Sequence, residues 1–449
     1  MRVFTLDTKI KECLPALNLV LCFLIFFIIA HSLVIGSETL LFIAIILSLV
    51  YCAIAKIGNC FLLMCGISMF ESAFTIQGSN AWFALLVILV IRIIYKSNFK
   101  FKSFAFAGCL FLFALELLLD FFNGSMGQLL VNLVVVVFVF CIFSNLDKID
   151  VKPFSITCSL SLSFLCVLYY LISMYGGIDK FISVFMTSND AYRFGLEYGG
   201  SVGGSMAIPL YSAMIISCGL VYLIVEKSKH FFQMLFVAAS SFIAMFFGAI
   251  TISRSFFLCM IVLLMFLLVF KGKNSGSTRN KFILITIIVF SLLIFSQLDI
   301  FDKIFVDLGS RLNYEISPES GGRLSIWLAC FDFLFSNPIC LIFGIGATNY
   351  MNIALEYNLG FSAGAHNLLL DLIMSWGIVG AALIVCLCVF GLKRVLSPKC
   401  QRLMHAFLPL LVYLTFSMTA LRCNNLKTWI FLLVAFFFVK KYNTREDLL

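Results

Sequence analysis

A histidine and an arginine mark a polar stretch, residues 298–365, in an otherwise apolar chain. Within it, residues 321–327 read Gly-Gly-Arg-Leu-Ser-Ile-Trp, and the stretch ends at Ala365, directly before His366, where the next apolar run begins. Histidine is the side chain best suited to accept a proton near neutral pH, and the guanidinium of Arg323 can bind phosphate oxygens in pairs. At the water edge of a membrane, this combination suits proton transfer beside a lipid-linked anion.

Two further arginines lie close to apolar runs. Arg254 stands in a very short turn, residues 251–255, which reads Thr-Ile-Ser-Arg-Ser, and Arg193 lies in a segment of tyrosine and glycine. An ionisable group so close to a bilayer is a functional hypothesis by default. Each candidate also has a purely structural explanation. His366 could be an interfacial histidine at a helix start, and Arg323 could be a solvated residue paired with Glu319. Arg254 could anchor the chain to lipid headgroups, and Arg193 could be merely exposed.

Composition fixes the class of protein that must position these residues. The chain is 62% hydrophobic and only 12% charged, with a mean hydropathy of +1.10. Soluble domains average about 25% charged residues. Apolar runs of roughly 18 or more residues recur along the whole chain, and each is long enough to cross a bilayer as a helix. The sequence therefore predicts an all-α polytopic membrane protein.

The apolar runs predict about 14 transmembrane helices, and the three weakest of them make the range 12 to 14. The predicted spans are residues 14–35, 39–56, 58–76, 80–95, 103–122, 128–145, 154–175, 205–225, 231–250, 254–270, 282–297, 366–391, 404–421 and 427–440. We find no linker long or polar enough for a separate soluble domain. Residues 1–449 therefore form a single predicted membrane domain.

The distribution of lysine and arginine predicts the topology. If the N-terminus is cytoplasmic and the sides alternate, all but eight of the 31 Lys and Arg residues fall on the cytoplasmic side. Cytoplasmic segments carry such an excess, so we expect both termini to be cytoplasmic. The eight on the other side are Lys180, Arg193, Arg254, Lys303, Arg311, Arg323, Arg422 and Lys427. The net charge of +9 then mostly reflects the lysines and arginines of the cytoplasmic segments. It gives no reason to expect nucleic acid as a partner.

Two long segments are predicted to lie outside, residues 176–204 and residues 298–365. In the second, the stretch from Arg323 to Phe335 predicts a short amphipathic helix, and Asn337-Pro338 should end it. Several acidic residues lie in or near apolar runs, and we expect them to be satisfied inside the bundle or to face water, without a specific role. They are Glu71, Glu116, Asp120, Asp332 and Asp371.

The sequence gives no sign of a metal or a nucleotide cofactor. None of the 17 cysteines forms a Cys-x-x-Cys pair, and the four histidines are far apart in the sequence. There is neither a phosphate-binding loop of the P-loop type nor a dinucleotide fingerprint. Cysteines within apolar spans behave as small hydrophobic residues. We therefore predict neither a metal nor a cofactor.

Several of these motifs together resemble the signature of the O-antigen ligase and O-antigen polymerase superfamily. They occur in the family's order and spacing: Gly322 to Trp327, Asn337-Pro338, Gly344-Ile345-Gly346, His366-Asn367 and Gly377-Ile378-Val379-Gly380. Residues 251–255 and Arg193-Phe194-Gly195 resemble two weaker elements of the same family. The chain departs from the pattern at Ser375, where members often have Glu, and it lacks an Asn in residues 195–210.

This resemblance implies an inverting glycosyltransferase of the GT-C type in the bacterial inner membrane, with its active site on the periplasmic side. Its donor would be an undecaprenyl-diphosphate-linked oligosaccharide, without metal or nucleotide. Arg254 and Arg323 would hold the diphosphate, with Arg193 assisting, and His366 would accept the proton of the acceptor hydroxyl. We add Asn367 and Trp327 as substrate-binding residues. Membrane lipids, a chain-length regulator and a flippase are the implied partners.

Three functions remain open at this point. A polymerase would extend one lipid-linked repeat unit with another, whereas a ligase would transfer the glycan to the lipid A core. We favour the polymerase, because a single His precedes Asn here, whereas ligases often carry a second one nearby. A flippase or transporter of lipid-linked saccharide ranks third. Carriers are often built from repeated halves, and we find no internal repeat in this chain.

Overall fold

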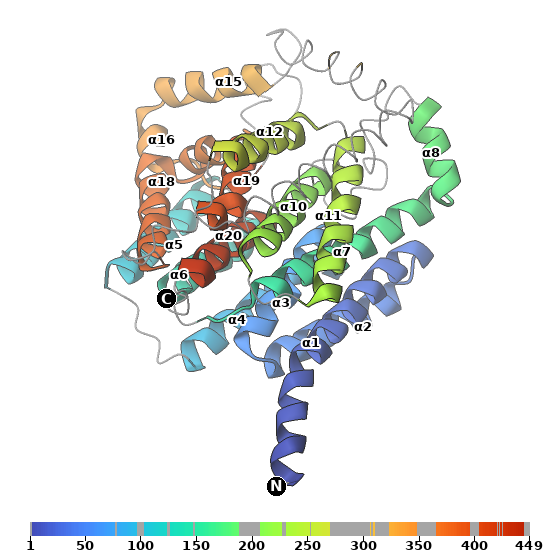
Figure 1. Ribbon diagram of the computed structural model, residues 1–449. Coiled ribbons are helices and arrows are strands. Elements are labelled where there is room, and N and C mark those ends of the chain that lie inside the picture. Colours follow the sequence, from blue (N-terminus) through green and yellow to red (C-terminus); the bar gives the residue numbers. More distant parts are fainter. Residues whose placement is uncertain are drawn as a thin grey trace.

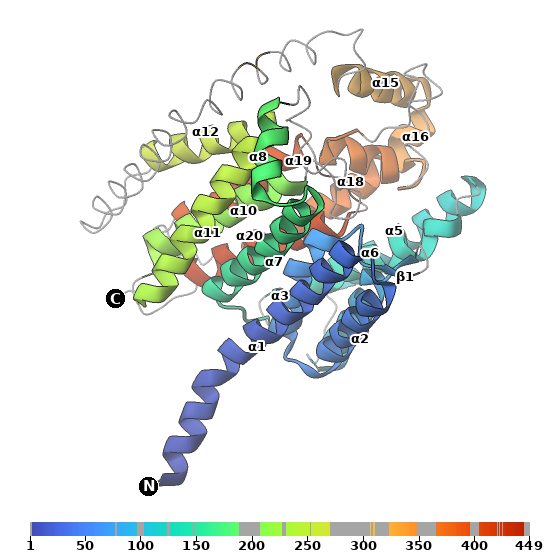
Figure 2. The same cartoon turned by 90° about the vertical axis from the view of Figure 1, so that its right-hand side faces the viewer.

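The computed structural model describes most of the chain as a bundle of helices (Figures 1 and 2). The described residues are 2–76, 79–96, 103–123, 126–146, 149–187, 207–226, 230–251, 253–269, 306, 309, 323–347, 365–395, 404–419, 421, 423 and 425–443. Among the predicted features, the span 282–297, Arg193, Lys303, Arg311 and Arg422 lie outside the described residues.

The first half of the described chain forms eight α-helices, a short 3-10 helix and one minimal hairpin. The helices are α1 (Arg2–Ile35), α2 (Glu38–Ile54), α3 (Ile57–Ile67), η1 (Ser68–Phe70), α4 (Trp82–Lys96), α5 (Ser103–Asn123), α6 (Met126–Ser144), α7 (Pro153–Met174) and α8 (Ile178–Thr187). The strands β1 (Thr75–Ile76) and β2 (Ser79–Asn80) pair antiparallel between η1 and α4. The helix α8 occupies part of the segment predicted as the first long outer loop.

The second half contributes the remaining helices. They are α10 (Ala207–Val225), α11 (Phe231–Ile250), α12 (Arg254–Val269), α15 (Arg323–Ser336), α16 (Pro338–Phe343), α18 (Leu368–Val395), η7 (Met404–Phe407), α19 (Leu408–Ser417) and α20 (Leu426–Asn443). Figure 1 shows α15 lying across one end of the bundle, with α16 turning down beside α18. The first described residues of α1 and the last described residues of α20 lie toward the opposite end in the two views.

Burial separates the centre of the bundle from its rim. Nearly every side chain of α10 and α20 is buried; α10 is apolar on every side, and the lysines of α20 stand at its two ends. Helices α1, α2, α5, α11 and α12 each expose large apolar side chains on one side. A helix that is apolar all round must be buried in protein or lipid. The exposed side chains of the rim therefore suit contact with lipid, and α10 and α20 form the protein core.

The described helices coincide in position with the predicted spans, although only some of them are long enough to cross a membrane. Each predicted span that falls on described residues coincides with a helix, although 58–76 ends in η1 and the β1–β2 hairpin. By length and composition, six of the described helices can cross a membrane: Ala16–Ile35, Ala105–Phe122, Pro153–Met174, Ala207–Val225, Phe231–Ile250 and Leu368–Lys393. Several others are apolar but shorter. These helices indicate a multi-pass membrane protein and confirm the predicted helical class.

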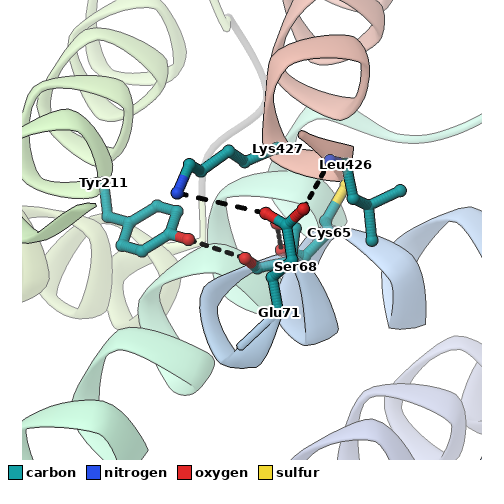
Figure 3. A network of polar contacts seen from close by, with 6 residues as sticks. All are labelled: Cys65, Ser68, Glu71, Tyr211, Leu426 and Lys427. Atoms are coloured by element: carbon teal, nitrogen blue, oxygen red, sulfur yellow. Dashed lines mark hydrogen bonds and ion pairs between the residues drawn. The ribbon is translucent and has the colours of Figure 1, made fainter. Parts of the chain in front are cut away.

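Buried polar contacts join helices from distant parts of the sequence. The hydroxyl of Tyr211 in α10 donates to the carbonyl of Ser68 in η1 at 2.6 Å. The carboxylate of Glu71 accepts the backbone N–H of Leu426 at 2.7 Å and lies 4.0 Å from the ammonium of Lys427 (Figure 3). Glu71 thus lies inside the bundle with one carboxylate oxygen hydrogen-bonded. Its Oε2 atom is buried and, among the described residues, has only the ammonium of Lys427 nearby, so the prediction that this carboxylate is satisfied is partly right. Glu71 fixes the start of α20 against the end of η1.

Candidate functional site

The helix α15 begins at Arg323, as the sequence predicts, and Asn337-Pro338 ends it. The side-chain amide of Asn337 donates to the carbonyl of Phe333 at 2.9 Å, which satisfies one of the open carbonyls at the end of α15. Pro338 is the first residue of α16, where proline is favoured because that position needs no N–H donor. The side chain of Arg323 lies outside the described part of the structure.

The prediction that α15 is amphipathic is only partly right, because two of its faces are apolar. Ile326, Cys330 and Leu334 are buried against Leu370 and Met374 of α18. The large apolar residues on the other side of the helix are exposed: Leu324, Leu328, Phe331 and Phe335. Asp332 is also exposed, as predicted for an acidic residue that faces water. The helix therefore packs on α18 with one face and presents a second apolar face outward.

A hydrogen bond joins α15 directly to the histidine segment. The indole Nε1–H of Trp327 donates to the backbone carbonyl of Ala365 at 2.6 Å. Ala365 is fully buried and directly precedes His366. Trp327 lies one helical turn after Arg323. The fold thus brings together the two motifs that the sequence places at the start of α15 and at the start of α18.

His366 has an unusual backbone conformation. Its φ is +52°, and it is the sole non-glycine with positive φ in the described ranges. Positive φ is uncommon outside glycine, although histidine adopts it more readily than most residues. A residue held in this region must be fixed by its surroundings, and such residues cluster at functional sites. The side chain is half-buried, and its Nδ1 atom is shielded from solvent.

Asn367 begins α18 as its N-cap. Its side-chain oxygen accepts the backbone N–H of Leu369 at 3.1 Å and of Leu370 at 3.3 Å, and its carbonyl accepts the N–H of Asp371 at 2.8 Å. Asparagine is among the preferred N-cap residues because its side chain satisfies these N–H groups. The described contacts of Asn367 are therefore structural, and its predicted contact with substrate stays a prediction.

Two glycine motifs of the sequence meet at a break in α18. Gly377 has φ +67° and ψ −177°, so α18 consists of two helical pieces joined there. The N–H groups of Ile345 and Gly346 donate to the carbonyls of Met374 and Ser375 at 3.0 and 2.9 Å. A break in a helix leaves the carbonyls of the preceding turn open, and this turn satisfies two of them.

The turn after α16 and the break in α18 meet along a seam, and close packing requires the glycine on each side of it. A Cβ atom at Gly344 would overlap the backbone of Ser375, and one at Gly377 would overlap the carbonyl of Ile342. The sequence motifs Gly344-Ile345-Gly346 and Gly377-Ile378-Val379-Gly380 therefore have a structural meaning. They let the turn after α16 lie directly against the break in α18.

A buried carboxylate from α5 lies at the same seam. Glu116 accepts the indole N–H of Trp376 and the amide of Asn132, both at 2.6 Å, and the backbone N–H of Ala347 at 3.4 Å. Glu116 is satisfied inside the bundle, as expected of the acidic residues. Its association with the glycine motifs was not predicted. A glutamate inside an apolar span was the signal that could have indicated it.

A second buried carboxylate, Asp371, ties α18 to the segment before α20. Asp371 accepts the backbone N–H of Cys423 at 2.6 Å, and the indole of Trp429 donates to the carbonyl of the same cysteine at 2.7 Å. The hydroxyl of Ser375 lies 3.3 Å from the Cys423 sulfur. Burial raises the pKa of the Cys423 thiol well above its usual value, which is typical of a structural cysteine.

Arg254 is the first residue of α12, directly after the turn from α11, and its side chain is half-buried. The carbonyl of Ser253 accepts the N–H groups of Phe256 and Phe257 at 3.0 and 3.2 Å, which begins the helix. Helix α12 packs against α10, α11 and α19, whereas His366 and Trp327 lie where α15 meets α18. The described contacts thus unite Trp327, His366 and Asn367, and Arg254 stands on a separate helix.

Arg254 and Arg323 share an electrostatic setting. Each is the first described residue of a helix, and at a helix start backbone N–H groups lack helical partners and the helix dipole is positive. A cation is disfavoured there by itself, and an anion is favoured. Helix starts bind phosphate readily for these reasons. An arginine at such a start is therefore suited to a site that holds a strongly negative group.

Comparison with known proteins identifies the region that carries these features. Residues 238–385 match the family model described as O-Antigen ligase. The match extends from α11 into the second piece of α18 and includes Arg254, Arg323 and His366. It supports the resemblance to the O-antigen ligase and polymerase superfamily within this segment, whereas Arg193-Phe194-Gly195 lies outside the match. No curated protein was found to match the chain.

Proposed function

We propose that the chain polymerises surface polysaccharide by joining undecaprenyl-diphosphate-linked repeat units. The transfer would be inverting, with a GT-C-like arrangement of about 14 helices. It would occur on the periplasmic side of the bacterial inner membrane, with both termini in the cytoplasm. The observation that carries the proposal is the placement of Arg254 and Arg323 as the first residues of two helices, together with His366 fixed ahead of a third.

The diphosphate of the donor explains the two arginines. The leaving diphosphate concentrates negative charge at headgroup level, and a guanidinium stays charged and matches phosphate oxygens with paired donors. Open N–H groups at the starts of α12 and α15 would add to the same attraction. We assign Arg254 and Arg323 to the diphosphate. Arg193, which lies outside the described residues, is proposed to assist them.

His366 would act as the general base. The oxygen of the acceptor hydroxyl attacks the anomeric carbon of the donor sugar while the bond from that carbon to the diphosphate oxygen breaks. The diphosphate leaves with the bonding electron pair, and the hydroxyl proton passes to His366. The bond from Trp327 to Ala365 supports this role, because it fixes the residue before His366. Asn367 and Trp327 are kept as proposed substrate contacts.

The second candidate is the ligase, which uses the same donor and the lipid A core as acceptor. The matching family model is described as O-Antigen ligase, but the match does not distinguish the two enzymes, and the single His before Asn favours the polymerase. A flippase ranks third, because the candidate residues lie together on one side of the predicted topology. A polymerase would work beside a chain-length regulator and the flippase that supplies its repeat units.

Replacement of His366 by Ala tests the proposal and separates the two enzymes. Loss of a general base typically lowers a rate by about 10²–10⁴-fold. A polymerase mutant should display lipopolysaccharide core with a single repeat unit, and a ligase mutant should display bare core and accumulate lipid-linked polymer. Gel banding of extracted lipopolysaccharide distinguishes them. His31→Ala, a histidine on α1, is the matched control and should keep normal ladders. Normal ladders in the His366→Ala strain would overturn both assignments.

A further inference from the structure

Glu116 of α5 is fully buried in the part of the bundle that faces α18. Both oxygens of its carboxylate accept hydrogen bonds: Oε2 from the indole of Trp376, and Oε1 from the amide of Asn132 and the N–H of Ala347. Burial of a carboxylate is costly unless donors surround it. The three donors come from α18, from α6 and from the turn after α16. Glu116 therefore connects α5 to three separate parts of the fold.

Two of these donors flank the seam between the glycine motifs. Ala347 ends the turn whose N–H groups bond to Met374 and Ser375. Trp376 is the last residue of the first piece of α18, directly before the break at Gly377. The carboxylate thus holds both sides of the seam at once. An apolar residue at position 116 would leave the buried N–H of Ala347 and the indole N–H of Trp376 without this acceptor.

The first piece of α18 transmits the position of this seam to the histidine. It begins at Leu368, directly after the cap Asn367, and ends at Trp376. Helical hydrogen bonds make such a short piece rigid, so its two ends move together. At one end the bond from Trp327 fixes Ala365, and at the other end Glu116 fixes Trp376.

We infer that Glu116 is a positioning residue for His366, acting through Trp376 and Ala347 without touching the substrate. The inference rests on the proposed role of His366 as the base. A displacement of about 1 Å at a reacting group can lower a rate by roughly 10²-fold, so the contacts of a distant carboxylate can matter to the reaction. Glu116 then affects the rate of transfer and leaves the binding of the donor unchanged.

The test compares Glu116→Gln, Trp376→Phe and the double variant. Glutamine has a single acceptor oxygen and cannot serve the indole on one side and Ala347 on the other. Phenylalanine keeps the ring of Trp376 and removes its N–H. Full-length protein in membranes is assayed with lipid-linked repeat units extracted from a strain that lacks this chain. We expect kcat to fall by about 10- to 100-fold, with KM for the donor within about twofold of the wild-type value.

The double variant and a matched carboxylate separate positioning from general damage. Because both substitutions act on the contact between Glu116 and Trp376, their losses should not add fully in the double variant. Glu71→Gln is the control: it is another buried glutamate that accepts a backbone N–H, at the start of α20. We expect it to leave kcat unchanged. A kcat that falls equally in Glu71→Gln, or fully additive losses in the double variant, would overturn the inference.

A second measurement does not depend on activity. The rate at which diethyl pyrocarbonate modifies His366, followed by mass spectrometry, should change at least threefold in Glu116→Gln and Trp376→Phe, and His31 should react as before. If His366→Ala stays active, the proposed function fails even where this rate changes. Trp376→Phe serves as the second variant in case Glu116→Gln does not fold, because it keeps the ring at this position. If His366→Ala is inactive while kcat and the modification rate are both unchanged in Trp376→Phe, the positioning role alone is wrong.

Discussion

The indole of Trp327 and the carbonyl of Ala365 are joined by a 2.6 Å hydrogen bond, although 38 residues separate them in the sequence. This bond holds the beginning of α15 against a residue just before the start of α18. His366 follows Ala365 and has φ +52°. This conformation is unfavourable for a residue other than glycine, so it persists only because the surrounding structure holds it. The tryptophan of the Arg323 motif therefore holds the residue directly before the histidine of the other motif.

We predict that Trp327→Phe lowers the rate of glycan transfer by about 10- to 100-fold, because His366 loses its fixed position. The buried carbonyl of Ala365 would lose its donor, which costs about 1–3 kcal/mol of stability. The rate is measured in membranes at equal abundance of the protein. Trp82→Phe is the control, because the indole nitrogen of Trp82 has no hydrogen-bond partner among the described residues. Equal activity of Trp327→Phe and wild type would contradict this role.

Arg323→Lys should be nearly as damaging as Arg323→Ala. A lysine keeps the charge at the start of α15 but cannot offer the paired donors of a guanidinium to phosphate oxygens. Gel ladders of surface polysaccharide from strains with equal membrane abundance measure the effect. Lys180→Ala, at an exposed position of α8, should leave the ladder unchanged. Long polysaccharide in the Arg323→Lys strain would rule out a bidentate contact with phosphate.

Much of this fold follows from the sequence because its signals are local. Apolar runs locate the helices, and Asn337-Pro338 marks the boundary between α15 and α16 through the capping amide and the ring of proline. The motifs around Arg323 and His366 likewise identify the region that the family model matches. Each of these inferences depends on residues that lie within a few positions of one another.

The contacts that complete the site are not local, and the sequence could not predict them. Glu116 and Trp376 are 260 residues apart, and a helix that is apolar all round gives no period that shows which face meets which neighbour. The backbone of His366 is set by its surroundings and has no sequence signature. The glycines at 344 and 377 indicated a motif, but their mutual packing needed the structure.

Gly377→Ala should destabilise the protein far more than Gly36→Ala. The two glycines have nearly the same φ, +67° and +66°, so both variants place an alanine at positive φ, which costs about 1–3 kcal/mol. At Gly36 a Cβ meets nothing within 4 Å, whereas at Gly377 it overlaps the carbonyl of Ile342. Thermal unfolding in detergent compares the two variants. Equal losses of stability would show that the seam between α16 and α18 tolerates a side chain.

The last prediction concerns the side of the membrane on which the site lies. All but eight of the 31 lysines and arginines sort to one side of the predicted topology, and positive residues favour the cytoplasm. The first described residues of α1 and the last described residues of α20 lie toward the end of the bundle opposite α15. Arg254, Arg323 and His366 should then face the periplasm.

Reporter fusions measure this directly, since 17 native cysteines complicate thiol labelling. A fusion after residue 275 should be active only with a cytoplasmic reporter, and a fusion near residue 315 only with a periplasmic one. A fusion at the C-terminus is the internal control and should report cytoplasm. If the fusion near 315 reports cytoplasm while the C-terminal control behaves as expected, the proposed base and arginines lie on the wrong side for a periplasmic transferase.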